Sequence, residues 1–129
     1  MTYLWVALGS ALGGVARYWC SGVAARLWGE SFPWGTILVN VAGSFVIGLF
    51  ATLTAPDGRV AASSEARVFV MVGLCGGYTT FSAFSLDSAL LIERGQYGQA
   101  AAYVVASVAA SIAAVFLGLA VFRSSGHLP

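Results

Sequence analysis

The chain has 129 residues, of which 59% are hydrophobic and only 9% are charged, and its net charge is +1. A soluble domain carries roughly a quarter charged residues, so this composition indicates one membrane-embedded domain. The near-neutral charge provides no basic surface for nucleic acid, and no nucleic-acid partner is expected. The chain has no lysine and a single histidine, His127, close to its end. This excludes a P-loop, Schiff-base chemistry and a Ser-His-Asp triad, so we do not expect an enzyme.

Four apolar segments follow one another, at about residues 3–28, 33–53, 68–92 and 100–122. Each meets or exceeds the roughly 20 residues that a helix needs to cross a bilayer. The joints between them are short and contain proline, glycine or acidic residues, which end helices or begin them. The pattern predicts an all-α membrane protein with four transmembrane helices in one multi-pass domain, surrounded by membrane lipid.

The first segment carries a charge, Arg17, about 15 residues after its start. A charge at that depth is unfavourable unless it faces water or a partner. Two interpretations stay open: Arg17 draws anions into a vestibule, or it pairs structurally with backbone carbonyls or an acid. Gly9 and Gly13 are four residues apart in the same segment, a spacing that favours close helix packing.

The arginines in the joints and near the chain ends scarcely determine an orientation. With four spans, one side of the membrane would hold Arg59, Arg67 and Arg123, and the other side Arg26 and Arg94. Three against two is a weak bias under the positive-inside rule. One interpretation is insertion in both orientations, which permits an antiparallel, dual-topology homodimer. The other is a single orientation with poor signals.

Two uncharged polar stripes run along the second and fourth segments. Residues four apart lie on one helix face, and these stripes are Thr36, Asn40 and Ser44, and Tyr103, Ser107 and Ser111. Such stripes commonly hold helices together through hydrogen bonds. They also suit a small anion that must exchange its water shell for protein donors.

The third segment contains the most unusual run of the chain, from Gly73 to Ser85. Paired glycines are poor in helices, so we expect the third helix to be broken at Gly76–Thr80. The freed carbonyls could bind a cation, and a π-bulge without an ion is the alternative. Phe81 and Phe84 would share a helix face after the break. They either pack against lipid or core, or offer their electropositive ring edges to an anion.

These stretches together resemble the Fluc/CrcB family of fluoride ion channels. The matching sequences are GGVARY at 13–18, FPWGT at 32–36, VNVAG at 39–43 and GLCGGYTTFSAFS at 73–85. The resemblance covers nearly the whole chain, and the last stretch is the most specific. Two departures are visible: the family often has threonine at the position of Ala83 and glutamate at the position of Asp87.

The resemblance implies an antiparallel homodimer that exports cytoplasmic fluoride passively through two pores in the cell inner membrane. It implies a structural sodium ion at the dimer interface, held by the backbone carbonyls of Gly76 and Thr79 from both subunits. It also implies that Arg17 belongs to the entry region or to structure. The pore residues that it implies are Asn40, Phe81, Phe84, Tyr103, Ser107 and Ser111.

Two rival functions remain. A small four-span, proton-coupled drug or cation exporter would need an acidic residue deep in a span. The acidic residues Glu30, Asp57 and Glu65 fall in joints instead, and Asp87 lies near the last turns of the third segment. The other rival is a membrane scaffold without transport of its own.

Overall fold

The computed structural model describes residues 1–123, so His127 lies outside the described part. Every element of regular structure in residues 1–123 is helical, which agrees with the predicted all-α class. The long helices are α1 (Thr2–Trp28), α2 (Trp34–Leu53) and α6 (Tyr97–Arg123). The third predicted segment is made of four pieces, α3 (Ser64–Arg67), the π-helix η1 (Val68–Cys75), α4 (Gly76–Tyr78) and α5 (Phe81–Glu93).

Three stretches of residues 1–123 are long and apolar enough to cross a membrane: Trp34–Leu53, Ser64–Glu93 and Tyr97–Arg123. Helix α1 has 27 residues, which is sufficient length, but it does not reach the same apolar content. Arg17, Arg26 and the polar and glycine residues between its aliphatic side chains are the reason. The fold is therefore that of a helical, multi-pass membrane protein.

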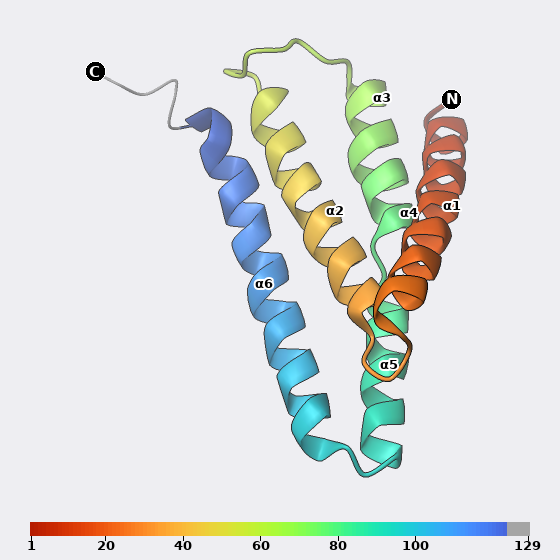
Figure 1. The fold of residues 1–129 in the computed structure, drawn as a ribbon. Coiled ribbons are helices and arrows are strands. Elements are labelled where there is room, and N and C mark those ends of the chain that lie inside the picture. Colours follow the sequence, from red (N-terminus) through yellow and green to blue (C-terminus); the bar gives the residue numbers. More distant parts are fainter. Residues whose placement is uncertain (124–129) are drawn as a thin grey trace.

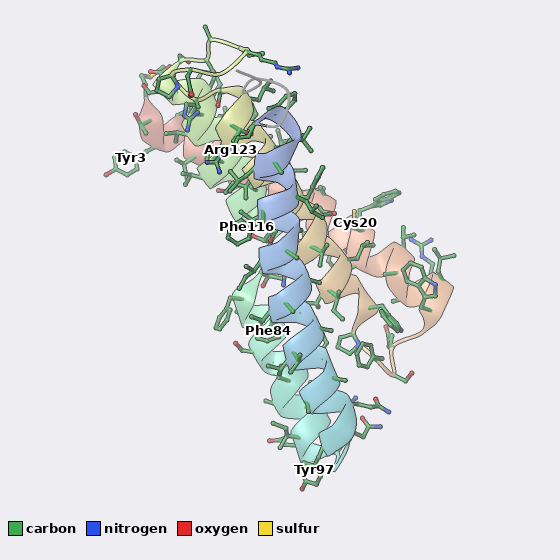
Figure 2. All side chains as sticks on the ribbon, turned by 90° about the vertical axis from the view of Figure 1, so that its left-hand side faces the viewer. Tyr3, Cys20, Phe84, Tyr97, Phe116 and Arg123 are labelled. Carbon is green, nitrogen blue, oxygen red and sulfur yellow. The ribbon has the colours of Figure 1, made fainter. Side chains whose placement is uncertain are left out.

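The elements form a bundle whose connections alternate between its two ends (Figure 1). The start of α1, the connection from α2 to α3 and the C-terminal end of α6 lie at one end. The α1–α2 and α5–α6 connections lie toward the other. Helix α2 packs beside α6, while α1 packs on η1 and α4. Figure 2 shows that the C-terminal half of α1, which carries Cys20, leans out of the bundle away from α6.

Glycines allow these helices to approach closely. A Cβ at Gly9 would lie 2.5 Å from the backbone oxygen of Phe69, and a Cβ at Gly13 would overlap the backbone oxygen of Leu74. Only small residues permit this contact between α1 and η1, as the spacing of the two glycines predicted. Gly48 and Gly118 make the matching contact between α2 and α6, where each faces backbone of the other helix.

The break in the third segment lies at the C-terminal end of the predicted range. Gly76 keeps a helical backbone, with φ −63° and ψ −38°, and Gly77 belongs to α4. The chain becomes extended at Thr79 and Thr80, inside the predicted range Gly76–Thr80 but after the glycine pair. The physical reason is that Gly77 serves packing: a Cβ there would lie 2.6 Å from the backbone oxygen of Ser10 on α1.

Large apolar side chains cover the outside of the chain, and few large side chains are buried. Val39, Leu91 and Tyr103 are the largest side chains fully buried in the described residues. Tyr3, Tyr18 and Phe116 are exposed in the single chain, and Tyr3 and Phe116 stand away from the ribbon in Figure 2. An apolar exterior of this extent is suited to lipid or to another protein subunit.

Candidate functional site

The site is organised around the break between α4 and α5. Thr79 has φ −86° and ψ 158°, and Thr80 has φ −151° and ψ 113°, so both are extended. Asn40 on α2 pairs with Thr80: its Nδ2 donates to the Thr80 oxygen at 3.1 Å, and its Oδ1 accepts from the Thr80 nitrogen at 2.7 Å. The amide therefore satisfies both backbone groups of Thr80, as a neighbouring strand would.

The hydroxyl of Thr80 begins the next helix. Thr80 Oγ1 accepts a hydrogen bond from the Ala83 nitrogen at 3.1 Å, which is the N-cap arrangement that threonine favours. Phe81 and Phe84 then occupy the first turn of α5. The pair of Asn40 and Thr80 thus fixes the start of the helix that carries both phenylalanines.

The same hydrogen bonds divert donors from two backbone carbonyls. In a continuous helix the Thr80 nitrogen would donate to the Gly76 oxygen, and the Ala83 nitrogen would donate to the Thr79 oxygen. Here these nitrogens donate to Asn40 Oδ1 and to Thr80 Oγ1 instead. The break therefore frees the carbonyls of Gly76 and Thr79, and Gly76 is exposed on the single chain.

Arg17 lies at the other side of the break. Its Nε donates to the backbone oxygen of Gly77 at 3.2 Å, and the side chain is half-buried between α1 and α4. In a continuous helix this oxygen would accept from the nitrogen of Phe81. A guanidinium here supplies a strong donor to a carbonyl that the break has exposed.

A groove of about 450 Å³ runs beside the break, between α2, the third segment and α6. None of the residues that line it carries a formal charge. The polar groups come from all three walls, and the lining includes Asn40, Ser44, Gly76, Thr79, Thr80, Ser107 and Ser111, together with Phe81 and Phe84. The structure thus brings most of the predicted site residues into one groove.

The two phenylalanines form one wall. Their ring centroids lie 5.6 Å apart with planes inclined by 46°, and the Phe84 ring also contacts the Tyr103 ring at 5.4 Å. Phe81 is 78% exposed in the single chain, whereas Phe84 is half-buried. A phenyl ring with this much exposure must meet lipid, a second subunit or the contents of the groove.

Ser107 on α6 presents an unusual hydroxyl. Its Oγ is buried, and within residues 1–123 it makes no hydrogen bond. A buried polar atom without a partner is rare and points to a bound species or to water. Since Ser107 lines the groove, this unpaired hydroxyl lies in the groove wall.

Tyr103 differs from the other predicted pore residues, because it does not line the groove. Its side chain is 0% exposed, and its hydroxyl donates to Asp87 Oδ2 at 2.9 Å. Thr36 Oγ1 donates to the same oxygen at 2.7 Å. Two of the expected hydroxyl donors are therefore occupied by a carboxylate, which the polar stripes alone could not reveal.

The sequence interpretation also missed Gly43, which packs directly on the break. A Cβ at Gly43 would overlap Thr79 Cγ2, so only glycine lets α2 approach Thr79 so closely. The signal was present in the sequence, since Gly43 lies between Asn40 and Ser44 on α2. Residues 1–123 contain no group of three His, Cys, Asp or Glu side chains that could hold a metal.

Comparison with known proteins places the chain in a family. The family model described as "CrcB-like protein, Camphor Resistance (CrcB)" matches residues 4–119. A protein of Rhodospirillum rubrum named "Fluoride-specific ion channel FluC" is 58% identical over 118 residues, which cover 92% of both chains. Proteins with the same name from Opitutus terrae and Rhodopseudomonas palustris are 53% identical over 116 residues (90% of this chain, 88% of the relative) and 52% identical over 124 residues (96% and 98%). The chain therefore belongs to the CrcB family, as the resemblance of its motifs predicted.

Proposed function

We propose that the protein is a channel that conducts fluoride passively across the membrane. The observation that carries this proposal is the groove, which combines uncharged hydroxyl and amide groups with two phenylalanine rings and no charged lining residue. The names of relatives that are 52–58% identical support the choice of fluoride as the ion. No step of bond chemistry is needed, so the protein acts without catalysis.

The groove chemistry suits a small, strongly hydrated anion. Ser107 Oγ has no other hydrogen-bond partner within residues 1–123, and Ser111 lies one turn further along α6. Phenyl ring edges carry partial positive charge, so Phe81 and Phe84 hold an anion weakly. Weak binding at successive positions lets an ion leave as easily as it enters.

The proposed assembly is an antiparallel, dual-topology homodimer in which each chain spans the membrane four times. Helix α1 serves as the additional span, because Gly9 and Gly13 hold it against η1. Arg17 is compatible with this depth because it donates to the Gly77 carbonyl. A second chain would cover the exposed ring of Phe81 and complete the wall of the groove.

A structural sodium ion at the dimer interface fits the carbonyls of Gly76 and Thr79. Both carbonyls have lost the donors that a continuous helix would supply. Unwound backbone carbonyls are common cation ligands in membrane proteins, and Gly76 is exposed where a second subunit could contribute its own pair. When bound, the ion would be coordinated by the four carbonyl oxygens and would hold the two breaks together.

The electrical field across an inner membrane would drive fluoride outward. A unit charge that crosses the whole field gains roughly 2.3 kcal/mol per 100 mV. An energy source such as ATP is then unnecessary. In this proposal the protein resides in the cell inner membrane and limits cytoplasmic fluoride.

Liposomes separate this function from proton-coupled export and from a scaffold. The expected result is fluoride release that needs no proton gradient. An exporter of cations should instead accumulate a substrate only when a pH gradient is imposed, and it should need a carboxylate in its path. Helix α5 contains two acidic residues, Asp87 and the final residue Glu93. Neither of them lines the groove.

A further inference from the structure

The hydrogen bonds of Asp87 identify a residue with a role beyond the groove. Its Oδ2 accepts from Thr36 Oγ1 at 2.7 Å and from Tyr103 Oη at 2.9 Å. One carboxylate oxygen therefore receives two hydroxyl hydrogens, from α2 and from α6. This is the arrangement that two hydroxyls would adopt around a small anion, with the oxygen of the protein in the place of the ion.

The three residues lie one helical turn beyond the groove lining, on α2, α5 and α6. Thr36 precedes Asn40 by four residues, Asp87 follows Phe84 by three, and Tyr103 precedes Ser107 by four. Asn40, Phe84 and Ser107 all line the groove. Residues three or four apart lie on one helix face, so the cluster lies just beyond the groove lining. It lies on the side of the α1–α2 and α5–α6 connections, which Figure 1 shows toward one end of the bundle.

The aromatic contacts couple this cluster to the groove wall. The centroid of the Tyr103 ring lies 5.4 Å from the centroid of the Phe84 ring and 5.6 Å from that of the Phe32 ring, which it meets edge-on. The side chain of Tyr103 is fully buried, so its hydroxyl has no access to bulk water. While the carboxylate accepts the hydroxyl hydrogens of Thr36 and Tyr103, neither hydroxyl can donate to an anion.

We propose that Asp87 is a positioning residue that competes with the permeating anion for the hydroxyl hydrogens of Thr36 and Tyr103. An anion that passes from Ser107 toward the α1–α2 end reaches these hydroxyls only when Asp87 Oδ2 gives them up. The carboxylate thus limits how tightly fluoride binds at this end of the groove. This inference rests on the proposed fluoride conduction.

The test is the fluoride dependence of flux in liposomes for wild type and Asp87→Asn. Asparagine has nearly the same shape, but its neutral oxygen forms weaker hydrogen bonds than a carboxylate does. The half-saturating fluoride concentration should fall by about fivefold, since charge-assisted hydrogen bonds are roughly twice as strong as neutral ones. In a Tyr103→Phe background, Asp87→Asn should change the half-saturating fluoride concentration by much less, because the Tyr103 hydroxyl is then absent.

Several outcomes would overturn the inference. One is an unchanged or raised half-saturating concentration in Asp87→Asn. Another is a shift of the half-saturating concentration by Asp87→Asn that is equally large with Tyr103 and with Phe at position 103. The half-saturating concentration of Asp87→Glu should lie closer to wild type than that of Asp87→Asn, because glutamate keeps the negative charge. Asp87→Ser serves as a second neutral variant, and failure of both neutral variants to assemble would assign Asp87 to folding alone. Absence of flux in wild type would refute the proposed function instead.

Discussion

Asn40 and Thr80 are 40 residues apart in the sequence, and two hydrogen bonds join the side-chain amide of one to both backbone groups of the other. This pair replaces the helical hydrogen bonds that the third segment gives up at the break. It also releases the carbonyls of Gly76 and Thr79 and places Phe81 and Phe84 beside the groove.

Asn40→Asp should impair both stability and flux. A carboxylate can still accept from the Thr80 nitrogen, but it has no hydrogen to donate to the Thr80 oxygen. Leaving such a buried group unpaired costs about 1–3 kcal/mol. Thermal unfolding in detergent and fluoride flux should both show the loss. Ser44→Ala is the matched control for stability, since Ser44 lies one turn further on α2 and lines the same groove. Equal melting temperatures for Asn40→Asp and wild type would contradict the role of this pair.

Phe81→Ile and Phe84→Ile should each reduce fluoride flux while dimer assembly persists. Isoleucine keeps the apolar bulk but has no electropositive ring edge. A decrease of about tenfold corresponds to roughly 1.4 kcal/mol in the barrier. Phe116→Ile is the control, because Phe116 is exposed on α6 and does not line the groove. If both groove variants conduct at the wild-type rate, the ring edges are not part of the path.

Gly13→Ala should destabilise the protein, whereas Gly14→Ala should not. A methyl group at Gly13 would overlap the Leu74 backbone oxygen, while a Cβ at Gly14 would meet nothing within 4 Å. Backbone atoms cannot rotate away as a side chain can, so we expect a loss of about 1–3 kcal/mol for Gly13→Ala. Thermal unfolding of the two purified variants compares neighbouring positions on one helix. Equal stability would show that α1 does not pack on η1 in this way.

Sodium should raise the melting temperature of the purified protein above its value in N-methylglucamine at equal ionic strength. An ion at 100 times its dissociation constant stabilises by about 2.7 kcal/mol. Gly43→Ala should reduce this difference, because the new methyl group displaces Thr79, whose carbonyl is a proposed ligand. Gly22→Ala is the control, since a Cβ there would meet nothing within 4 Å. Identical melting curves in sodium and in N-methylglucamine would contradict the proposed sodium site.

Labelling of the chain from each side of the membrane tests the proposed dual topology. A single cysteine introduced at Gly98, which is exposed at the start of α6 and where a Cβ would meet nothing within 4 Å, should react with an impermeant reagent from both sides in about equal amounts. The native Cys20 and Cys75 would be replaced by alanine first. Reaction from only one side would show that all chains share one orientation.

Apolar segment length alone predicted where the helices lie, to within a few residues. The second segment was expected at 33–53 and forms Trp34–Leu53, and the third begins at Ser64 rather than at 68. The earlier start arises from Ser63, whose hydroxyl caps the helix by accepting from the Ala66 nitrogen. Helix periodicity also predicted which hydroxyls share a face.

Contacts between distant segments could not be predicted from periodicity. The glycine pair at 76–77 suggested a break by its poor helix propensity, but tertiary packing of Gly77 on Ser10 keeps it helical. The actual break at Thr79 and Thr80 depends on Asn40, on another helix. The hydrogen bond from the Tyr103 hydroxyl to the Asp87 carboxylate likewise depends on how α5 and α6 pack together, and no local sequence pattern encodes that packing.

Fluoride release from sealed liposomes is the decisive measurement for the proposed channel. Purified protein is reconstituted in vesicles loaded with potassium fluoride, valinomycin is added to balance charge, and a fluoride electrode records the external concentration. If the protein conducts fluoride, release is rapid and depends on the protein, and chloride release from matched vesicles is far slower. Protein-containing vesicles that retain their fluoride as well as empty vesicles do would contradict the proposed conduction.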